Sequence, residues 1–192
     1  MAAIVLSVAT GTAALLGFLL YIRNIRKGSV DLNPATWMVW VVATWIIGVS
    51  YFVLTRDVAK SVPSILGAIQ TLIIFLVALR KGRIARINWQ DWAVIIISAL
   101  AIYVWARYKS AAYANFIMIG CRTIAFLPTY KGVWRESIQE KQGPWAIWTL
   151  SHLLNIAVVR LRGQDPWQEY VYPVSHTILH SILTLMIRMR NT

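Results

Sequence analysis

The sequence predicts an all-helical integral membrane protein with seven transmembrane helices. Of its 192 residues, 58% are hydrophobic and only 14% are charged, whereas a soluble domain carries roughly 25% charged residues. Apolar runs that are long enough to cross a bilayer recur along the whole chain. We therefore expect a compact helical bundle with almost no mass outside the membrane.

Seven apolar runs, separated by charged or turn-forming residues, define the expected helices. They cover residues 2–22, 36–55, 58–80, 91–107, 111–130, 144–160 and 170–188. The first run lacks the basic segment of a signal peptide, so we expect it to be a mature helix. Asn33-Pro34 and Gly143-Pro144 are typical helix starts, because proline is tolerated in the first turn. The single cysteine, Cys121, lies inside an apolar run and predicts no disulfide.

The net charge of +12 is unevenly distributed, and its distribution predicts an orientation. With the N-terminus outside, the inner segments hold 12 Lys and Arg residues and the outer segments hold 6. The inner set is Arg23, Arg26, Lys27, Arg80, Lys81, Arg83, Arg86, Lys131, Arg135, Lys141, Arg188 and Arg190. The positive-inside rule then favours an outer N-terminus and a cytoplasmic C-terminus. We expect anionic lipids at the cytoplasmic face as partners of these charges, and no nucleic acid.

The chain contains an internal repeat. A shift of 108 residues aligns two stretches without a gap, and a further shift of two residues extends the match. The residues that coincide include Phe18 with Phe126, Trp37 with Trp145, Trp40 with Trp148, Pro63 with Pro173, and Gln70 with His180. We therefore expect residues 1–90 and 109–192 to be two three-helix repeats, joined by a linker helix over residues 91–108. Because successive spans alternate in direction, the two repeats must run parallel in the membrane.

This 3+1+3 arrangement is similar to that of the SWEET sugar transporters and the wider PQ-loop clan. The proline of that clan, at the inner end of the first helix of each repeat, resembles Pro128 in "FLPTYKGVW". Thr129 follows it where the clan has glutamine, and the first repeat has Leu20 where proline is expected. The chain also resembles small bacterial membrane proteins. The resemblance implies a small-solute transporter or facilitator of the bacterial cytoplasmic membrane, with a midplane pocket between the repeats.

Polar side chains inside the apolar runs are the candidate binding residues, because polar groups are costly in a bilayer. With a rise of about 1.5 Å per residue, five such side chains on four helices lie at comparable depth. The predicted substrate-binding residues are Trp45, Gln70, Arg122, His152, Asn155, His176 and His180. Arg122 is suited to an anionic group of the substrate. The resemblance implies pocket-lining roles for Gln70 and His180, with Trp45 as the aromatic wall.

Prolines inside the apolar runs are candidate hinges, since proline removes a hydrogen bond from a helix. The three are Pro63, Pro128 and Pro173. Four tryptophans, Trp37, Trp92, Trp145 and Trp167, flank the ends of runs, so we expect them in the membrane interface.

Three alternatives stay open. Each polar residue is also explained by a hydrogen bond to a neighbouring helix. The three histidines, His152, His176 and His180, are a possible ligand set for haem or a chlorin, although we expect no cofactor and no metal. The chain is also compatible with an oligomer or a subunit of a larger membrane complex. An enzyme is not expected, because the sequence has no Ser-His-Asp pattern, paired intramembrane carboxylates or phosphate loop.

Overall fold

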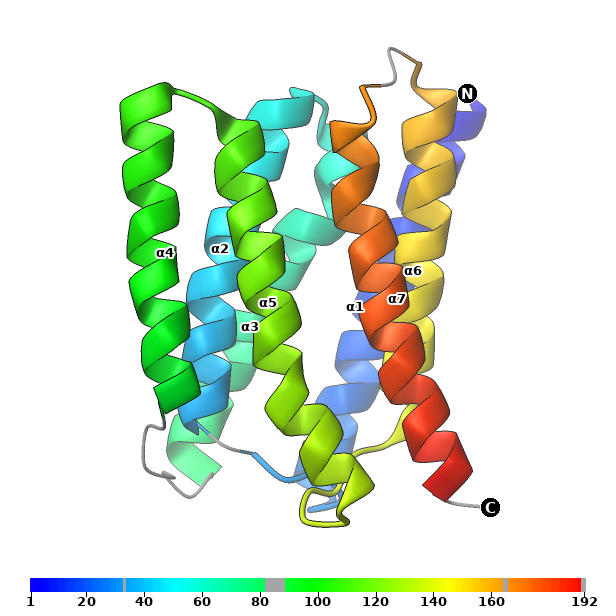
Figure 1. Cartoon of the computed structure of the whole chain (residues 1–192). Coiled ribbons are helices and arrows are strands. Elements are labelled where there is room, and N and C mark those ends of the chain that lie inside the picture. The colour runs from blue at the N-terminus through cyan, green and yellow to red at the C-terminus, as the bar shows by residue number, and fades with distance from the viewer. Residues whose placement is uncertain (33, 82–88, 164–165, 191–192) are drawn as a thin grey trace. The chain divides into compact units, whose positions relative to one another are not determined.

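The computed structural model describes residues 1–32, 34–81, 89–163 and 166–190, and these residues form seven helices (Figure 1). The helices are α1 (Ala2–Arg26), α2 (Pro34–Thr55), α3 (Val58–Lys81), α4 (Trp89–Tyr108), α5 (Ala111–Trp134), α6 (Gln142–Leu161) and α7 (Gln168–Arg190). The all-helical class and the order of the helices are confirmed. The observed helices extend the predicted ones by up to four residues, because a helix continues past the charged residue that ends an apolar run. Asn33, Arg83 and Arg86 lie outside the described residues.

Five of the helices are long and apolar enough to cross a membrane. They are α1, residues 36–55 of α2, α3, α5 and α7, and such helices are typical of integral membrane proteins. Helix α6 has 20 residues, a length of about 30 Å, but it carries several polar side chains. Membrane crossing by the seven helices stays a prediction, and α4 and α6 are not among the five that meet this length and hydropathy.

The helices pack into two compact units. The first unit comprises Met1–Asp31 and Phe126–Thr192, and therefore α1, the end of α5, α6 and α7. The second unit comprises Leu32–Ala125, and therefore α2, α3, α4 and the start of α5. These packing units follow other boundaries than the repeats predicted at 1–90, 91–108 and 109–192. The repeats describe similarity along the sequence, and that division stays a prediction.

In the first unit, α1 packs closely against α6 because its buried face carries mainly small residues. The small side chains of this face are Ser7, Thr10, Gly11, Ala13, Ala14 and Gly17. Two side chains of α6 donate hydrogen bonds to carbonyl oxygens of α1. Trp148 Nε1 donates to Ala14 at 3.2 Å, and Ser151 Oγ donates to Thr10 at 2.9 Å. Small residues and interhelical hydrogen bonds are the usual means of holding helices together in a membrane.

Two glycines close helices of this unit. Gly28 follows α1 with φ +66°, and Gly163 follows α6 with φ +58°. This left-handed conformation lets the chain leave a helix while its last carbonyl groups still accept hydrogen bonds. After α1, the N–H of Ser29 donates to the carbonyl oxygen of Asn24 at 3.1 Å. The sequence thus ends both helices with a residue that lacks a Cβ.

In the second unit, α2 and α3 form a tight hairpin. Asp57 Oδ1 accepts the N–H of Ala59 at 2.8 Å and so caps the start of α3. The helices then approach closely, because a Cβ on Gly48 would lie only 3.2 Å from the carbonyl oxygen of Ser64. Deeper in the hairpin, the hydroxyl groups of Thr44 and Thr71 are hydrogen-bonded at 2.7 Å.

The start of α5 joins this hairpin through Asn115. Its Nδ2 donates to the carbonyl oxygen of Ile47 at 3.3 Å and to Ser50 Oγ at 3.1 Å. Both acceptors lie on α2, so one amide group holds α5 against the hairpin from inside the unit.

The two tryptophan pairs that the repeat aligns have nearly the same geometry. Trp37 and Trp40 lie 5.0 Å apart between ring centroids at 67°, and Trp145 and Trp148 lie 5.2 Å apart at 76°. Trp37 and Trp145 are 5% and 1% exposed, so they face the interior of their units, and their depth at the membrane interface stays a prediction. Their spacing of three residues from the next tryptophan turns both rings of a pair inward. Trp92 and Trp167 are 55% and 65% exposed, as an interfacial position requires.

Gly17 tests the close packing of α1 and α6. A Cβ at this position would lie 2.9 Å from Cδ1 and Nε1 of Trp148, whose indole is held by its hydrogen bond to Ala14. We expect Gly17→Ala to destabilise the protein by about 1–3 kcal/mol, the usual cost of overpacking, and to lower its melting temperature in detergent. Gly120→Ala is the matched control, since nothing lies within 4 Å of its Cβ position. Equal melting temperatures for the two variants would contradict this packing.

Candidate functional site

Three histidines of the first unit lie against one another. His152 comes from α6, and His176 and His180 come from successive turns of α7. The ring centroid of His152 lies 5.1 Å from that of His176 and 5.1 Å from that of His180, and the latter two are 6.0 Å apart. All three side chains are buried. We call these residues the histidine cluster.

Aromatic rings surround the histidine cluster. Tyr172 lies 4.4 Å from His176 and 5.4 Å from His152 between ring centroids. Trp145, Phe126 and Trp148 lie 5.4, 5.7 and 6.1 Å from His180. The Nδ1 atom of His176 is 3.0 Å from the carbonyl oxygen of Tyr172 and must be its donor, because a carbonyl only accepts. This bond fixes the tautomer of a neutral His176 and leaves Nε2 as an acceptor.

Asn155 adds an amide group to the same helix face. It follows His152 by three residues on α6 and is 0% exposed. Within the described residues, neither Oδ1 nor Nδ2 of Asn155 has a hydrogen-bond partner, and neither does Oγ1 of Thr10 on α1. Buried polar groups are nearly always hydrogen-bonded in proteins. These atoms are therefore places where a water molecule or a polar ligand would gain hydrogen bonds.

The contacts between α1 and α6 indicate what faces Asn155. Trp148 bonds to Ala14 and Ser151 bonds to Thr10, so rising numbers on α6 meet falling numbers on α1. One turn beyond Ser151, this register brings Asn155 to the level of Ser7. Ser7 and Asn155, and Thr10 one turn away on α1, are all buried. We call the histidine cluster together with Thr10 and Asn155 the polar centre.

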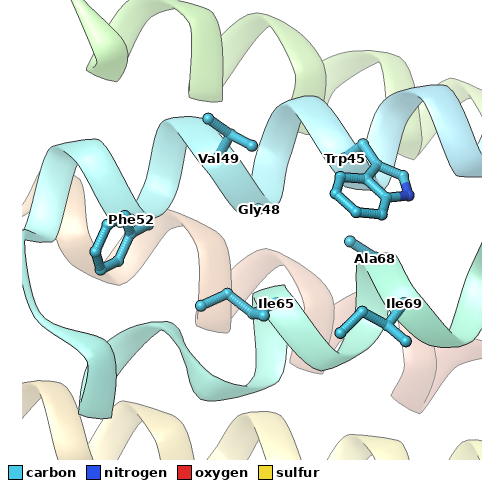
Figure 2. A pocket seen from close by; sticks show the side chains of 7 residues that line it. All are labelled: Trp45, Gly48, Val49, Phe52, Ile65, Ala68 and Ile69. Atoms are coloured by element: carbon cyan, nitrogen blue, oxygen red, sulfur yellow. The ribbon is translucent and has the colours of Figure 1, made fainter.

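Three predicted site residues belong to the second unit. Arg122 is buried with its guanidinium carbon 5.3 Å from the ring centroid of Trp40, an arrangement that stabilises a cation. Gln70 is buried in α3. Trp45 is 42% exposed and lines an apolar groove whose other lining residues do not include Gln70 or Arg122 (Figure 2).

The three predicted hinge prolines lie inside helices. α3 continues through Pro63, α5 through Pro128 and α7 through Pro173. None of them ends its helix, and their role as hinges stays a prediction. Pro128 lies three residues after Ala125, where α5 passes from the second unit into the first.

Sequence reasoning missed Glu140. It lies in the α5–α6 connection, residues 135–141, among charged residues that suggest a solvated loop. Its carboxylate accepts two hydrogen bonds at 3.0 Å, one from Tyr21 Oη on α1 and one from Trp145 Nε1 on α6. Burial raises the pKa of Glu140 to about 7, although the bonds from Trp145 and Tyr21 lower it. No local pattern reveals this contact, because Tyr21 and Glu140 are 119 residues apart.

Further hydrogen bonds hold the α5–α6 connection in place. The N–H of Asp31 donates to the carbonyl oxygen of Gln139 at 3.0 Å, and the N–H of Gln139 donates to Asp31 Oδ2 at 2.7 Å. An Nη atom of Arg190, at the end of α7, donates to the carbonyl oxygen of Ile138 at 3.2 Å. Glu140 therefore sits on a fixed segment at the end of the first unit.

Aromatic contacts connect Glu140 with the histidine cluster. Its partner Tyr21 lies 6.2 Å from Trp145 and 5.5 Å from Trp148 between ring centroids, and both tryptophans contact His180. A change in the charge of Glu140 thus acts on rings that cover the cluster. In chemical terms, both the amide and the neutral imidazole groups can donate and accept hydrogen bonds.

The described residues contain no group of three His, Cys, Asp or Glu side chains arranged to hold a metal ion. Comparisons of the chain with protein-family models, with curated proteins and with solved structures find no match. What the polar centre does is therefore argued from its own chemistry.

Glu140 predicts a specific pH dependence of stability. The folded protein favours the neutral carboxyl, so the unfolded chain ionises first as the pH rises from 4.5 to about 7. The contribution of this group to stability is thus complete below pH 4.5 and lost as the pH rises through about 7. We therefore expect the melting temperature of Glu140→Gln to fall less between pH 5 and pH 8 than that of the wild type.

The quantity to compare is the slope of the melting temperature against pH. The absolute melting temperature is less informative, because glutamine also loses one of the two hydrogen bonds that Glu140 accepts. Glu136→Gln, an exposed position in the same connection, is the control and should keep the slope of the wild type. The assignment fails if Glu140→Gln and Glu136→Gln melt with the same pH dependence.

Proposed function

We propose that the protein is a small-solute transporter or facilitator of the SWEET and PQ-loop type, and that its polar centre binds the solute. The observation that carries the proposal is Asn155. Its amide is fully buried, yet neither of its polar atoms has a partner among the described residues. Leaving such a group unpaired costs about 1–3 kcal/mol, a cost that a bound solute offsets.

The surroundings of Asn155 define the class of solute. The amide supplies one acceptor and two donor hydrogens, and the histidine cluster adds further donors and acceptors. Tyr172 and Trp148 lie within 5.4 and 6.1 Å of histidine rings and offer flat faces for stacking. These groups suit a polar solute with several hydrogen-bonding groups. Arg122, if it contributes, extends the range to anionic solutes.

We further propose that α1–α3 and α5–α7 are parallel repeats with α4 as the linker. Two features support this architecture. The aligned tryptophan pairs share their ring geometry. The aligned residues Pro63 and Pro173, and likewise Gln70 and His180, are buried at equivalent places on α3 and α7.

We place the protein in a bacterial cytoplasmic membrane, and the distribution of Lys and Arg supports an orientation with the N-terminus outside. The α5–α6 connection then faces the cytoplasm, and Glu140 titrates close to the pH found there. Protonation of Glu140 removes a charge beside Tyr21 and Trp145, the two side chains that donate hydrogen bonds to its carboxylate.

The orientation is testable with two single-cysteine variants. Lys109 and Glu136 are exposed residues of the α4–α5 and α5–α6 connections, both with positive φ, while the native Cys121 is buried. We expect a membrane-impermeant maleimide to label Lys109→Cys in intact cells and Glu136→Cys only after lysis. The reverse pattern would assign the opposite orientation.

The binding role of Asn155 is testable against Asn115, a matched asparagine. Both are 0% exposed, and Asn115 Oδ1 has no partner among the described residues, but Asn115 Nδ2 makes two hydrogen bonds, whereas neither polar atom of Asn155 makes one there. We expect Asn155→Leu to keep or raise the melting temperature, because it removes an unpaired polar group. Asn115→Leu should lower the melting temperature by a few degrees.

Solute uptake should be reduced in Asn155→Leu even though this variant is as stable as the wild type. In proteoliposomes, uptake of the solute that shifts the melting temperature of the wild type should fall at least about tenfold in Asn155→Leu. That loss corresponds to about 1.4 kcal/mol. Wild-type uptake by a folded Asn155→Leu variant would remove the polar centre from the transport path.

A further inference from the structure

A groove opens on the surface of the α2–α3 hairpin. It has a volume of about 190 Å³, and seven residues line it: Trp45, Gly48, Val49, Phe52, Ile65, Ala68 and Ile69. Figure 2 shows Trp45 and Phe52 of α2 at its two ends, with Ile65 and Ile69 of α3 along the opposite side. We call it the α2–α3 groove. Every lining side chain is apolar, so the groove offers nothing to the polar solutes proposed above.

The spacing of the lining residues explains the groove. Trp45, Val49 and Phe52 are four and three residues apart, so they form one stripe on α2. Small residues sit where the two helices cross, with Gly48 against Ser64 and Ala68. The backbones therefore approach closely at the crossing while the large side chains stand on either side of it. The result is a slot with a narrow floor and bulky, exposed walls.

We propose that the α2–α3 groove binds an acyl chain of a phospholipid whose phosphate lies beside Arg56. The groove lies within two segments that are long and apolar enough to cross a membrane. Its large wall residues are more than a third exposed, so the groove opens onto what surrounds the helices. In a bilayer, those surroundings are hydrocarbon chains.

The dimensions favour an acyl chain over a partner helix. From Trp45 to Phe52 the groove is seven residues long, or about 10 Å, whereas a crossing helix contacts its partner over much of a core about 30 Å thick. Helices also associate in membranes through small residues. Here the small residues already form the α2–α3 crossing, and the groove presents tryptophan, phenylalanine and isoleucine.

Charge at the end of the groove fits the phosphate. The N–H of Arg56 donates to the carbonyl oxygen of Phe52 at 2.8 Å, which puts Arg56 one turn beyond the last groove residue of α2. Arg56 is exposed, whereas Lys60 is buried and Asp57 Oδ1 accepts the N–H groups of Ala59 and Lys60. An arginine at this level can bind a phosphate through two parallel hydrogen bonds.

Native mass spectrometry with two defined lipids tests the proposal. The full-length protein is incubated with phosphatidylglycerol or with diacylglycerol of the same acyl chains, and then exchanged into lipid-free detergent. We expect the wild type to retain one phosphatidylglycerol per chain. Val49→Trp, which fills the groove, should retain at least tenfold less. Val53→Trp is the control, because Val53 is equally exposed on α2 but does not line the groove.

The headgroup and the acyl chain are tested separately. Arg56→Gln should reduce retention of phosphatidylglycerol to that of diacylglycerol. Lipids brominated on the acyl chain should quench wild-type fluorescence more than that of Trp45→Phe, and this holds even if Val49→Trp does not fold. Equal retention by Val49→Trp and Val53→Trp, or equal quenching with and without Trp45, would overturn the proposal. A dimer that only Val49→Trp dissociates would assign the groove to a second copy of the chain instead.

Discussion

The contact between α1 and α6 is the interaction on which the first unit depends. The small face of α1 lets α6 approach until Trp148 and Ser151 reach carbonyl oxygens of the facing helix. This approach buries Asn155 and brings His152 to α7, where His176 and His180 complete the cluster. Larger side chains on α1 would hold α6 away and expose the buried groups of the polar centre.

The two units keep their polar residues in different ways. In the second unit, Asn115 donates to Ile47 and Ser50, Thr44 pairs with Thr71, and Arg122 lies over Trp40. These groups stabilise the packing of the helices that carry them. In the first unit, the amide of Asn155 and the hydroxyl of Thr10 lie buried without such bonds among the described residues. Asn115 Oδ1 also lacks a partner among the described residues, so the difference between the two asparagines is that neither polar atom of Asn155 makes a hydrogen bond there, whereas Asn115 Nδ2 makes two.

Helix geometry decides how much of this was predictable. The seven helices follow from apolar runs, and the approach of His152 to His176 and His180 follows from equal depth and a shared face. The sequence does not predict that α6 packs against α1. A face of small residues indicates that another helix packs closely there, but it does not identify that helix. The burial of Trp145 was not predicted. The sequence shows how far Trp145 lies from the helix end, but not that its side chain points into the unit. The role of Glu140 was not predicted because its contacts are tertiary: Tyr21 lies 119 residues away along the chain.

The long separation between α1 and α6 has a consequence for biosynthesis. The hydrogen bonds of Trp148 to Ala14 and of Ser151 to Thr10 join residues 134 and 141 positions apart. At a translation rate of about 5–20 residues per second, roughly 7–28 s separate the synthesis of α1 from that of α6. During that interval the small, partly polar face of α1 lacks its partner α6, although the end of α5, which belongs to the same unit, is already made. The contact on which the first unit depends therefore forms only after α2, α3, α4 and α5 have been made.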